Sequence, residues 1–149
     1  MPTLIENKKA YFNYEILEKF EAGIELVGLE VKSVKNKRGS LEGAHIIVRG
    51  GEAFLIGMQI PPYQPNNTSK DYDPLRNRKL LLTKKEIGIL AEAESKKGLT
   101  IVPISLYTKG RKIKVSLGIG RGKKKYDKRE SIKKRDTERD VAREMRDRM

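Results

Sequence analysis

The residue types that carry out catalysis are scarce in this sequence. The single histidine, His45, lies in a strand-like run, where we expect its ring on an exposed or half-buried face rather than on a metal. With no cysteine and no second histidine, no common set of metal ligands is complete. Asp71 and Asp73 stand just before Pro74, a pattern that is typical of turns rather than of an acid–base pair. We therefore predict a protein that is not an enzyme and that uses no metal or cofactor.

The glycines at 118, 120 and 122 resemble a phosphate-binding loop only in their spacing. A dinucleotide-binding fingerprint continues into an apolar helix, whereas Lys123, Lys124 and Lys125 follow here. We predict instead that these glycines release the segment that follows from the last strand.

Lysine and arginine offer a different chemistry, which is pairing with phosphate. Segment 61–79 is long enough to indicate a functional loop. Its end carries three cations, and two tyrosines lie nearby in the sequence: Arg76, Arg78, Lys79, Tyr63 and Tyr72. Cations beside aromatic rings favour an RNA surface, but a solvated charge cluster with tyrosines packed on the body explains the pattern equally well. Both alternatives stay open at this point.

The composition points to a polyanionic partner. The chain has 149 residues, with 33 lysines and arginines against 20 acidic residues, and a net charge of +13. Nucleic acid is the first expectation and an anionic membrane surface the second. The sequence contains no apolar run of the roughly 20 residues that a membrane span needs, and its start has no apolar signal core. Together with the absence of cysteine, these features lead us to expect a cytoplasmic protein outside the membrane. We also expect the protein to be a monomer.

The charge is distributed unevenly along the chain. Residues 121–149 hold 13 basic and 7 acidic residues but few apolar ones. Such a segment cannot bury enough surface to offset the entropy of ordering it. We predict a folded domain over 1–120 and a basic tail over 121–149 that is disordered when free. The alternative for the tail is a merely solubilising or non-specific arm.

The folded part consists mostly of predicted strands. Ile113, Val115, Leu117 and Ile119 alternate with polar residues, which indicates a half-buried strand. The other strand candidates are 99–108, joined to that strand by a turn at Lys109-Gly110, a hairpin of 44–48 with 53–58, and the runs 11–17 and 24–27.

Helix signals are fewer. Thr83 and Glu86 form a capping box ahead of Ile87, Leu90 and Ala91, and Gly98 is the predicted end cap. A weaker helix is predicted within 29–36. Several short strands with two to three accessory helices on a basic chain predict a mainly β protein, an antiparallel barrel like the oligonucleotide-binding (OB) fold.

Six sequence blocks, in order and at matching spacing, resemble the SmpB family of SsrA-binding proteins. They are Asn7-Lys8-Lys9-Ala10, Phe20-Glu21-Ala22-Gly23-Ile24, Gly28-Leu29-Glu30-Val31-Lys32-Ser33, Gly51-Glu52-Ala53-Phe54-Leu55, the run 73–82, and the run 122–129. The resemblance implies an OB-type barrel with accessory helices that binds the tRNA-like domain of transfer-messenger RNA (tmRNA, or SsrA RNA). It also implies delivery of that RNA to stalled ribosomes in trans-translation, with elongation factor Tu and alanyl-tRNA synthetase as indirect partners through the RNA.

The resemblance also implies a site on the barrel. Glu21, Leu81 and Thr83 match positions that face the RNA in the family, although Thr83 stands where an asparagine is often found. To these we add the basic residues of the body as expected RNA contacts: Lys8, Lys9, Lys32, Arg76, Arg78 and Lys79.

The tail is implied to reach the decoding centre of the small ribosomal subunit and to become helical along the empty messenger channel. Its expected contacts are Gly122 as hinge, Lys123, Lys124, Tyr126, Asp127, Lys128, Arg129 and Met145. Asp127, Lys128 and Arg129 match the family's Asp-Lys-Arg element, and Tyr126 stands where histidine is frequent. The competing interpretation is a general RNA-binding or ribosomal barrel protein with a non-specific basic arm.

Overall fold

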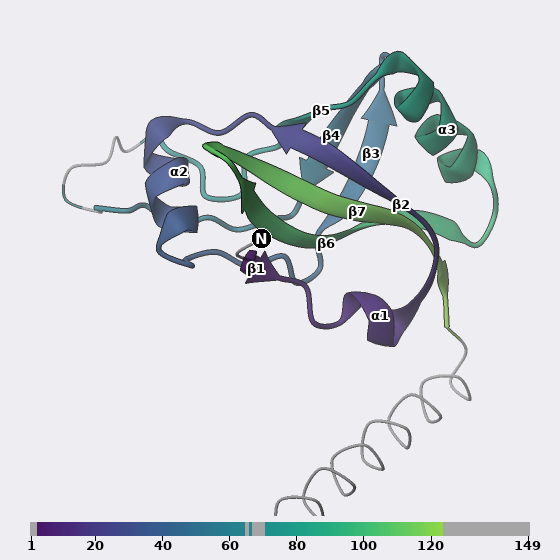
Figure 1. Cartoon of the computed structure of the whole chain (residues 1–149), viewed down its shortest axis with the longest axis horizontal. Coiled ribbons are helices and arrows are strands. Elements are labelled where there is room, and N and C mark those ends of the chain that lie inside the picture. Colours follow the sequence, from purple (N-terminus) through teal and green to yellow (C-terminus); the bar gives the residue numbers. More distant parts are fainter. Residues whose placement is uncertain (1–2, 65, 67–70, 124–149) are drawn as a thin grey trace, which may run out of the picture.

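Strands dominate the chain in the computed structural model, which describes residues 3–64, 66 and 71–123 (Figure 1). The elements follow in the order β1 (Thr3–Glu6), α1 (Ala10–Asn13), β2 (Tyr14–Ile24), α2 (Gly28–Lys35), β3 (His45–Arg49), β4 (Glu52–Ile56), β5 (Arg78–Leu81), α3 (Lys84–Ser95), β6 (Leu99–Lys109) and β7 (Lys112–Gly122). None of the helices in these ranges is long and apolar enough to cross a lipid bilayer.

Antiparallel pairing closes the sheet on itself. The strands follow the order β6-β3-β4-β5-β2-β7, and β7 pairs again with β6, while β1 adds to the edge of β6 that β3 also uses. This closed arrangement with three helices outside it confirms the prediction of a mainly β, OB-like barrel.

Strands β3 and β6 are joined by fewer residue pairs than any other neighbouring strands of the barrel. A single pair, Ile46 with Ile101, joins these strands. Helix α3 covers the seam between them with the buried side chains of Leu90 and Ala93. From the same helix, Glu94 accepts a hydrogen bond from the backbone N–H of Val48 at 2.8 Å, so a strand donor that lacks a ladder partner is satisfied.

The barrel interior is filled by the alternating residues of the long strands. Val115, Leu117 and Ile119 are buried and Ile113 is half-buried, as the alternation in β7 predicts. Each of the other five strands of the ring also contributes buried residues to this core. They are Ala22, Ile46, Ala53, Leu55, Leu80, Ile101 and Leu106.

Gly118 and Gly120 of β7 have a packing role, which corrects the expectation that they release the tail. Gly118 and Gly120 lie inside the strand, paired with Lys19 and Ile16 of β2. A Cβ at Gly118 would lie 2.8 Å from Cγ2 of Ile16, and one at Gly120 would lie 3.0 Å from Cβ of Tyr14. Glycine therefore allows the side chains of β2 to cross β7 closely.

The strand candidates 11–17 and 24–27 were only partly confirmed. Residues 14–17 and Ile24 belong to one continuous strand, β2, whereas residues 10–13 form a helical turn and residues 25–27 form no strand. Strands β1 and β5 were not predicted, because both have only four residues and β5 begins with an arginine.

The hairpin and helix predictions fare better. Strands β3 and β4 form the expected hairpin, and α2 covers the predicted weaker helix. Thr83 caps α3 as predicted, but the helix ends at Ser95, with Lys96 as its cap. Gly98 lies in the following turn, at φ +86°, rather than in the cap. The turn between β6 and β7 consists of Gly110 and Arg111.

An ion pair buried between α2 and β5 fixes the long connection that leads into β5. Glu30 and Arg78 both have 0% of their surface exposed, and their closest nitrogen–oxygen distance is 2.6 Å. The remaining guanidinium hydrogens of Arg78 are donated to the backbone oxygens of Met58, Pro74 and Arg76 at 2.8, 3.0 and 3.1 Å. Arg78 therefore ties both ends of the 57–77 connection to α2.

Glu30 remains ionised in this setting. Burial by itself raises the pKa of Glu30. Hydrogen bonds from Arg76 and from the Val27 N–H, together with the positive charge of Arg78, outweigh burial and hold the pKa below its ordinary value of 4.5. Because the folded-state pKa is lowered, the pair contributes its full stability above about pH 4.5 and loses it as the pH falls through the lowered pKa.

We predict that E30Q lowers the free energy of unfolding by about 3 kcal/mol at neutral pH, because it leaves a buried arginine without its counter-charge. Urea denaturation followed by circular dichroism measures this loss, and the difference from the wild-type protein should shrink in acid. The matched control is E42Q, which removes the exposed partner of Lys9 and should leave the urea midpoint unchanged. Equal effects of the two substitutions would contradict the role of the buried pair.

Candidate nucleic-acid interface

Glu21 is the centre of a polar cluster on the outer face of the barrel. Its carboxylate accepts a short hydrogen bond from the hydroxyl of Tyr107 and a second one from Nζ of Lys109 at 3.1 Å. These partners lie on β6, so the Glu21 side chain reaches over β7 to meet them. The cluster holds a carboxylate, a phenol and an ammonium group in fixed positions on an exposed surface.

Contacts within the cluster lower the pKa of Glu21 and raise the pKa of Tyr107. The hydrogen bond from Tyr107, followed by that from Lys109, lowers the pKa of Glu21 below its ordinary value. Burial and the hydrogen bond to Glu21 raise the pKa of Tyr107 to about 12. At neutral pH the cluster therefore presents a carboxylate, whose remaining lone pairs can accept from an RNA amino or hydroxyl group.

Leu81 belongs to the same outer face. Tyr107, Lys114, Gly23 and Leu81 are successive pairing partners across β6, β7, β2 and β5. Residues paired across antiparallel strands point to one side of the sheet, so these four share a face. Leu81 is 51% exposed there. Glu21 and Leu81, 60 positions apart in the sequence, are thus brought to one surface.

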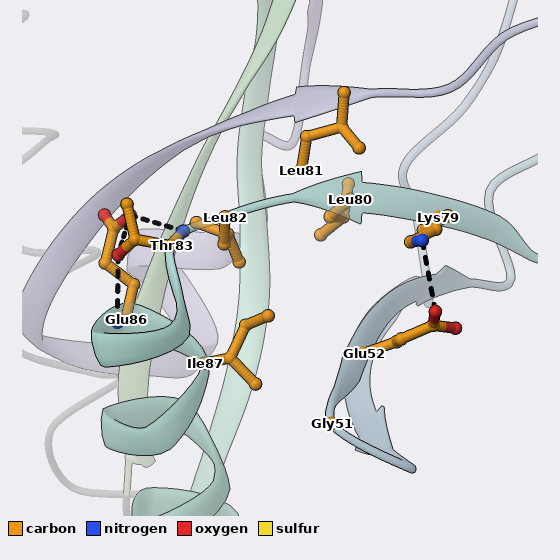
Figure 2. Close-up of a pocket in the computed structure, with 9 residues that line it drawn as sticks. All are labelled: Gly51, Glu52, Lys79, Leu80, Leu81, Leu82, Thr83, Glu86 and Ile87. Carbon is orange, nitrogen blue, oxygen red and sulfur yellow. Dashed lines mark hydrogen bonds and ion pairs between the residues drawn. The ribbon is translucent and has the colours of Figure 1, made fainter.

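Thr83 and Lys79 border a groove of about 520 Å³ along β5 and the start of α3 (Figure 2). The Thr83 hydroxyl accepts from the N–H of Glu86 at 3.2 Å and donates to its carboxylate at 2.9 Å. Because the helix cap engages this hydroxyl, Thr83 has little capacity left for RNA. Lys79 lies 3.1 Å from Glu52, and Leu81 points away from Ile87 in this view.

The cations at the end of segment 61–79 have different environments. The complete burial of Arg78 corrects the expectation that it contacts RNA, since its guanidinium has no path to phosphate. Arg76 is half-buried and contacts Glu30 at 2.6 Å, so its charge is partly compensated. Lys79 is also half-buried and pairs with Glu52 at 3.1 Å, so of the three predicted cations Arg76 and Lys79 are partly exposed and partly compensated, and Arg78 is enclosed.

One tyrosine of the segment fits packing on the body, and the other fits an RNA surface. Tyr72 donates its hydroxyl to the carbonyl of Ile60 at 2.7 Å, which fits packing on the body, and burial raises the pKa of this phenol. Lys32 is exposed on α2, with Nζ 5.9 Å from the centre of the half-buried Tyr63 ring. The pair of Lys32 and Tyr63 therefore keeps the cation-and-ring arrangement that favours RNA.

The remaining predicted residues lie at the end of the barrel where β7 ends. Lys8 and Lys9 precede α1 and are exposed, and Lys9 pairs with Glu42 at 2.6 Å. Gly122 is the last residue of β7, paired with Tyr14, and the N–H of Lys123 donates to the carbonyl of Asn13 at 2.8 Å. The predicted tail contacts Lys124, Tyr126, Asp127, Lys128, Arg129 and Met145 lie outside the described residues.

Sequence reasoning missed Tyr107, Lys109 and Lys114. The signal was present, because the alternation of 99–109 and 111–119 places these residues opposite the buried set. Their proximity to Glu21 depends on strand pairing, which no local pattern specifies. His45 is exposed on β3, as expected, and the described residues contain no group of three or more potential metal ligands.

The fold and this surface define an OB-type barrel with an exposed leucine and several lysines on one outer face. A family model described as "SmpB protein" matches residues 4–147. The chain belongs to the SmpB family, which confirms the resemblance seen in the sequence.

Similar proteins and a similar structure agree with this membership. The SsrA-binding protein of Microcystis aeruginosa is 49% identical over 142 residues, which cover 95% of this chain and 92% of the relative. That of Mesoplasma florum is 56% identical over 133 residues, 89% of each chain. A chain of the structure described as "tmRNA-SmpB: a journey to the center of the bacterial ribosome" aligns with a TM-score of 0.70 and 39% identity, over 88% of this chain and 95% of that one.

We predict that E21Q lowers the pKa of Tyr107 from about 12 toward 10, without reaching it, because burial still raises it. The readout is the pH dependence of the Tyr107 ring signal in NMR of tyrosine-labelled protein. E52Q, which removes a carboxylate that pairs with Lys79 on β5, is the control and should leave this pKa in place. An unchanged Tyr107 pKa in E21Q would show that the two groups are not coupled.

Proposed function

We propose that this chain binds the tRNA-like domain of tmRNA and delivers it to stalled ribosomes for trans-translation, the rescue and tagging of incomplete proteins. The observation that carries the proposal is membership of the SmpB family over nearly the whole chain. The RNA side of the barrel is the outer face that holds Glu21, Lys79, Leu81 and Lys114 together.

The chemistry of this face suits a folded RNA. Its lysines pair with phosphates, the Glu21 carboxylate accepts from a base or a ribose hydroxyl, and Leu81 packs against an exposed base or sugar. Lys32 with Tyr63 extends the surface on α2. Binding and positioning account for this function without a catalytic step by the protein, so we propose that the chain is not an enzyme.

A second part of the proposal concerns the segment after β7. The predicted tail begins at residue 121, but residues 121 and 122 still belong to β7, so the tail starts after Gly122. We propose that this tail, residues 123–149, enters the decoding centre and the messenger channel of the small ribosomal subunit. Asp127, Lys128 and Arg129 would contact the decoding centre, with Tyr126 stacking on a base and Met145 as an apolar contact further along. Lys8 and Lys9, which are exposed before α1, would add contacts from the barrel to the tmRNA.

Other partners follow from the RNA rather than from the protein surface. We propose elongation factor Tu and alanyl-tRNA synthetase as indirect partners that recognise the bound tmRNA. Because the ribosome is cytoplasmic, we propose that the protein acts in the cytoplasm. We also propose that one chain binds each RNA.

A general RNA-binding barrel with a non-specific arm is the competing function, and the RNA retained by the protein distinguishes the two. We predict that the tagged full-length chain co-purifies with one dominant RNA that has a tRNA-like end, identified by sequencing. A mixed pool that follows cellular abundance would support the competing function and contradict ours.

We predict that removing residues 124–149 leaves affinity for the tRNA-like domain within about twofold and abolishes tagging in a reconstituted translation system. This boundary keeps β7 intact, including the bond from Lys123 to Asn13. The triple variant D127K/K128E/R129E should have the same phenotype in the full-length chain. The control K96E/K97E/E92K makes the same change in net charge on exposed residues at the end of α3 and should tag normally.

Two outcomes would contradict the assignment of tmRNA binding to the barrel and of ribosome binding to the tail. A large loss of RNA affinity in the truncated chain would move the main RNA site into the tail. Normal tagging by the triple variant would remove the decoding role from Asp127, Lys128 and Arg129.

A further inference from the structure

Helix α2 ends in a group of exposed cations. Lys35 is the last residue of the helix, and Asn36 is its C-cap. Basic residues lie in the last turn and just after it, and all of them are exposed: Lys32, Lys35, Lys37 and Arg38. These four residues form the basic end of α2. Only Lys32 is among the predicted RNA contacts.

No carboxylate compensates the basic end. Within residues 3–64, 66 and 71–123, none of its four cations forms a salt bridge. Glu30 of the same helix is fully buried and is engaged by Arg76 and Arg78. The helix dipole favours Lys32 and Lys35 in the last turn, but its effect does not extend to the cations beyond the helix. The basic end therefore carries more positive charge than the helix needs for its stability.

Lys37 holds an unfavourable backbone conformation. Its φ is +59°, and within the described part of the chain it is the only residue other than glycine with a positive φ. The N–H groups of Lys37 and Arg38 donate to the carbonyls of Val34 and Ser33, each at 2.9 Å, which is a Schellman motif. Glycine fits the left-handed position of this motif best, because a Cβ is strained there. The fold itself therefore gives no reason for a lysine at this position.

The connection between β4 and β5 supports the basic end. The hydroxyl of Ser33 donates to the carbonyl of Pro61 at 2.7 Å, and Nη1 of Arg38 donates to the carbonyl of Tyr63 at 3.4 Å. Nζ of Lys32 lies 5.9 Å from the centre of the half-buried Tyr63 ring. These contacts anchor two of the four cations, so the basic end is a charged surface with a defined shape.

This surface has the chemistry to bind the sugar–phosphate backbone of RNA. The side chains of the basic end are all positively charged donors without an acceptor, and the Tyr63 ring is engaged by Lys32. Such groups pair with phosphates and carry no information about sequence. Contacts of this kind are typical of double-stranded RNA, because side chains cannot read the bases in its deep and narrow major groove.

The position of α2 indicates which RNA the basic end meets. Near the start of the helix, Leu26 and Val31 line a hollow together with Leu81, so α2 begins beside the proposed RNA face. The helix ends toward β1, where Gly39 lies against Ile5. Figure 1 shows α2 at the same end of the barrel as the tip of the β6–β7 hairpin, whereas β7 ends at the opposite end of the barrel. The basic end therefore continues the RNA face and lies away from the start of the tail.

We propose that the basic end of α2 binds the backbone of a base-paired stem of the tmRNA that the outer face holds. Lys35, Lys37 and Arg38 pair with phosphates of this stem. Because phosphate contacts orient a nucleic acid without selecting its sequence, the contact fixes the direction in which the RNA leaves the barrel. This inference rests on the proposed function, and it adds a second contact region on α2.

The variant K37G separates binding from stability in the full-length protein. Glycine relieves the strained backbone at position 37, so the urea midpoint should rise. The loss of one phosphate contact should at the same time lower the slope of log affinity against log salt by about one. Fluorescence anisotropy with the labelled tRNA-like domain measures this slope. A stabilised K37G protein with an unchanged slope would overturn the proposal.

The triple variant K35Q/K37Q/R38Q should lower the same slope by about three, one for each lost phosphate contact. The matched control K85Q/K96Q/K97Q removes the same charge from exposed residues of α3 and its end, and it should have a clearly smaller effect. In hydroxyl-radical footprinting, the triple variant should lose protection of one paired stem and keep protection elsewhere. Thermal unfolding checks that each variant is folded. Equal slopes for the triple variant and the control would overturn the proposal.

Two parallel measurements identify the RNA and separate this inference from the proposed function. If the triple variant loses affinity only for isolated small ribosomal subunits, the contact belongs to ribosomal RNA and the proposal is wrong. If the wild-type protein binds the tRNA-like domain no better than an unrelated hairpin of equal length, the proposed function fails. A lower slope for the triple variant on that hairpin would then still support a backbone site at the end of α2.

Discussion

The buried pair of Glu30 and Arg78 is the constraint on which the RNA face depends. It joins α2 to β5 and fixes the connection between β4 and β5 at both of its ends. Strand β5 in turn places Leu81 beside Gly23 and places Thr83 at the start of α3. An ion pair inside a small basic protein costs desolvation energy, so its value here lies in holding one arrangement of these elements.

Local patterns predicted the parts of the fold that local forces determine. The alternation in β7, the hairpin of β3 and β4 and the capping box at Thr83 each follow from neighbouring residues, and the structure has all three. The patterns did not predict β5, because a strand that begins with a buried arginine looks like part of a basic loop. In the sequence, an arginine that pairs with a buried glutamate looks the same as an arginine that binds RNA. Only the burial of Arg78 in the fold distinguishes these two roles.

The candidate site shows the same limit. Glu21 and Leu81 were named through the resemblance to a family, and the structure brings them to one face. Tyr107, Lys109 and Lys114 join them through strand pairing across β6 and β7, which no stretch of sequence encodes by itself. The close packing of Leu81 over Gly23 also joins residues that are 58 positions apart, so the sequence alone does not predict it.

We propose that the RNA lies on the outer face formed by β2, β5 and the β6–β7 hairpin. Amide hydrogen exchange of the full-length chain, with and without the tRNA-like domain of tmRNA, tests it directly. We expect slower exchange on these strands and on the start of α2, with little change on α3 beyond its first turn or on β3. Protection confined to α3 and β3 would instead place the RNA on the opposite side of the barrel.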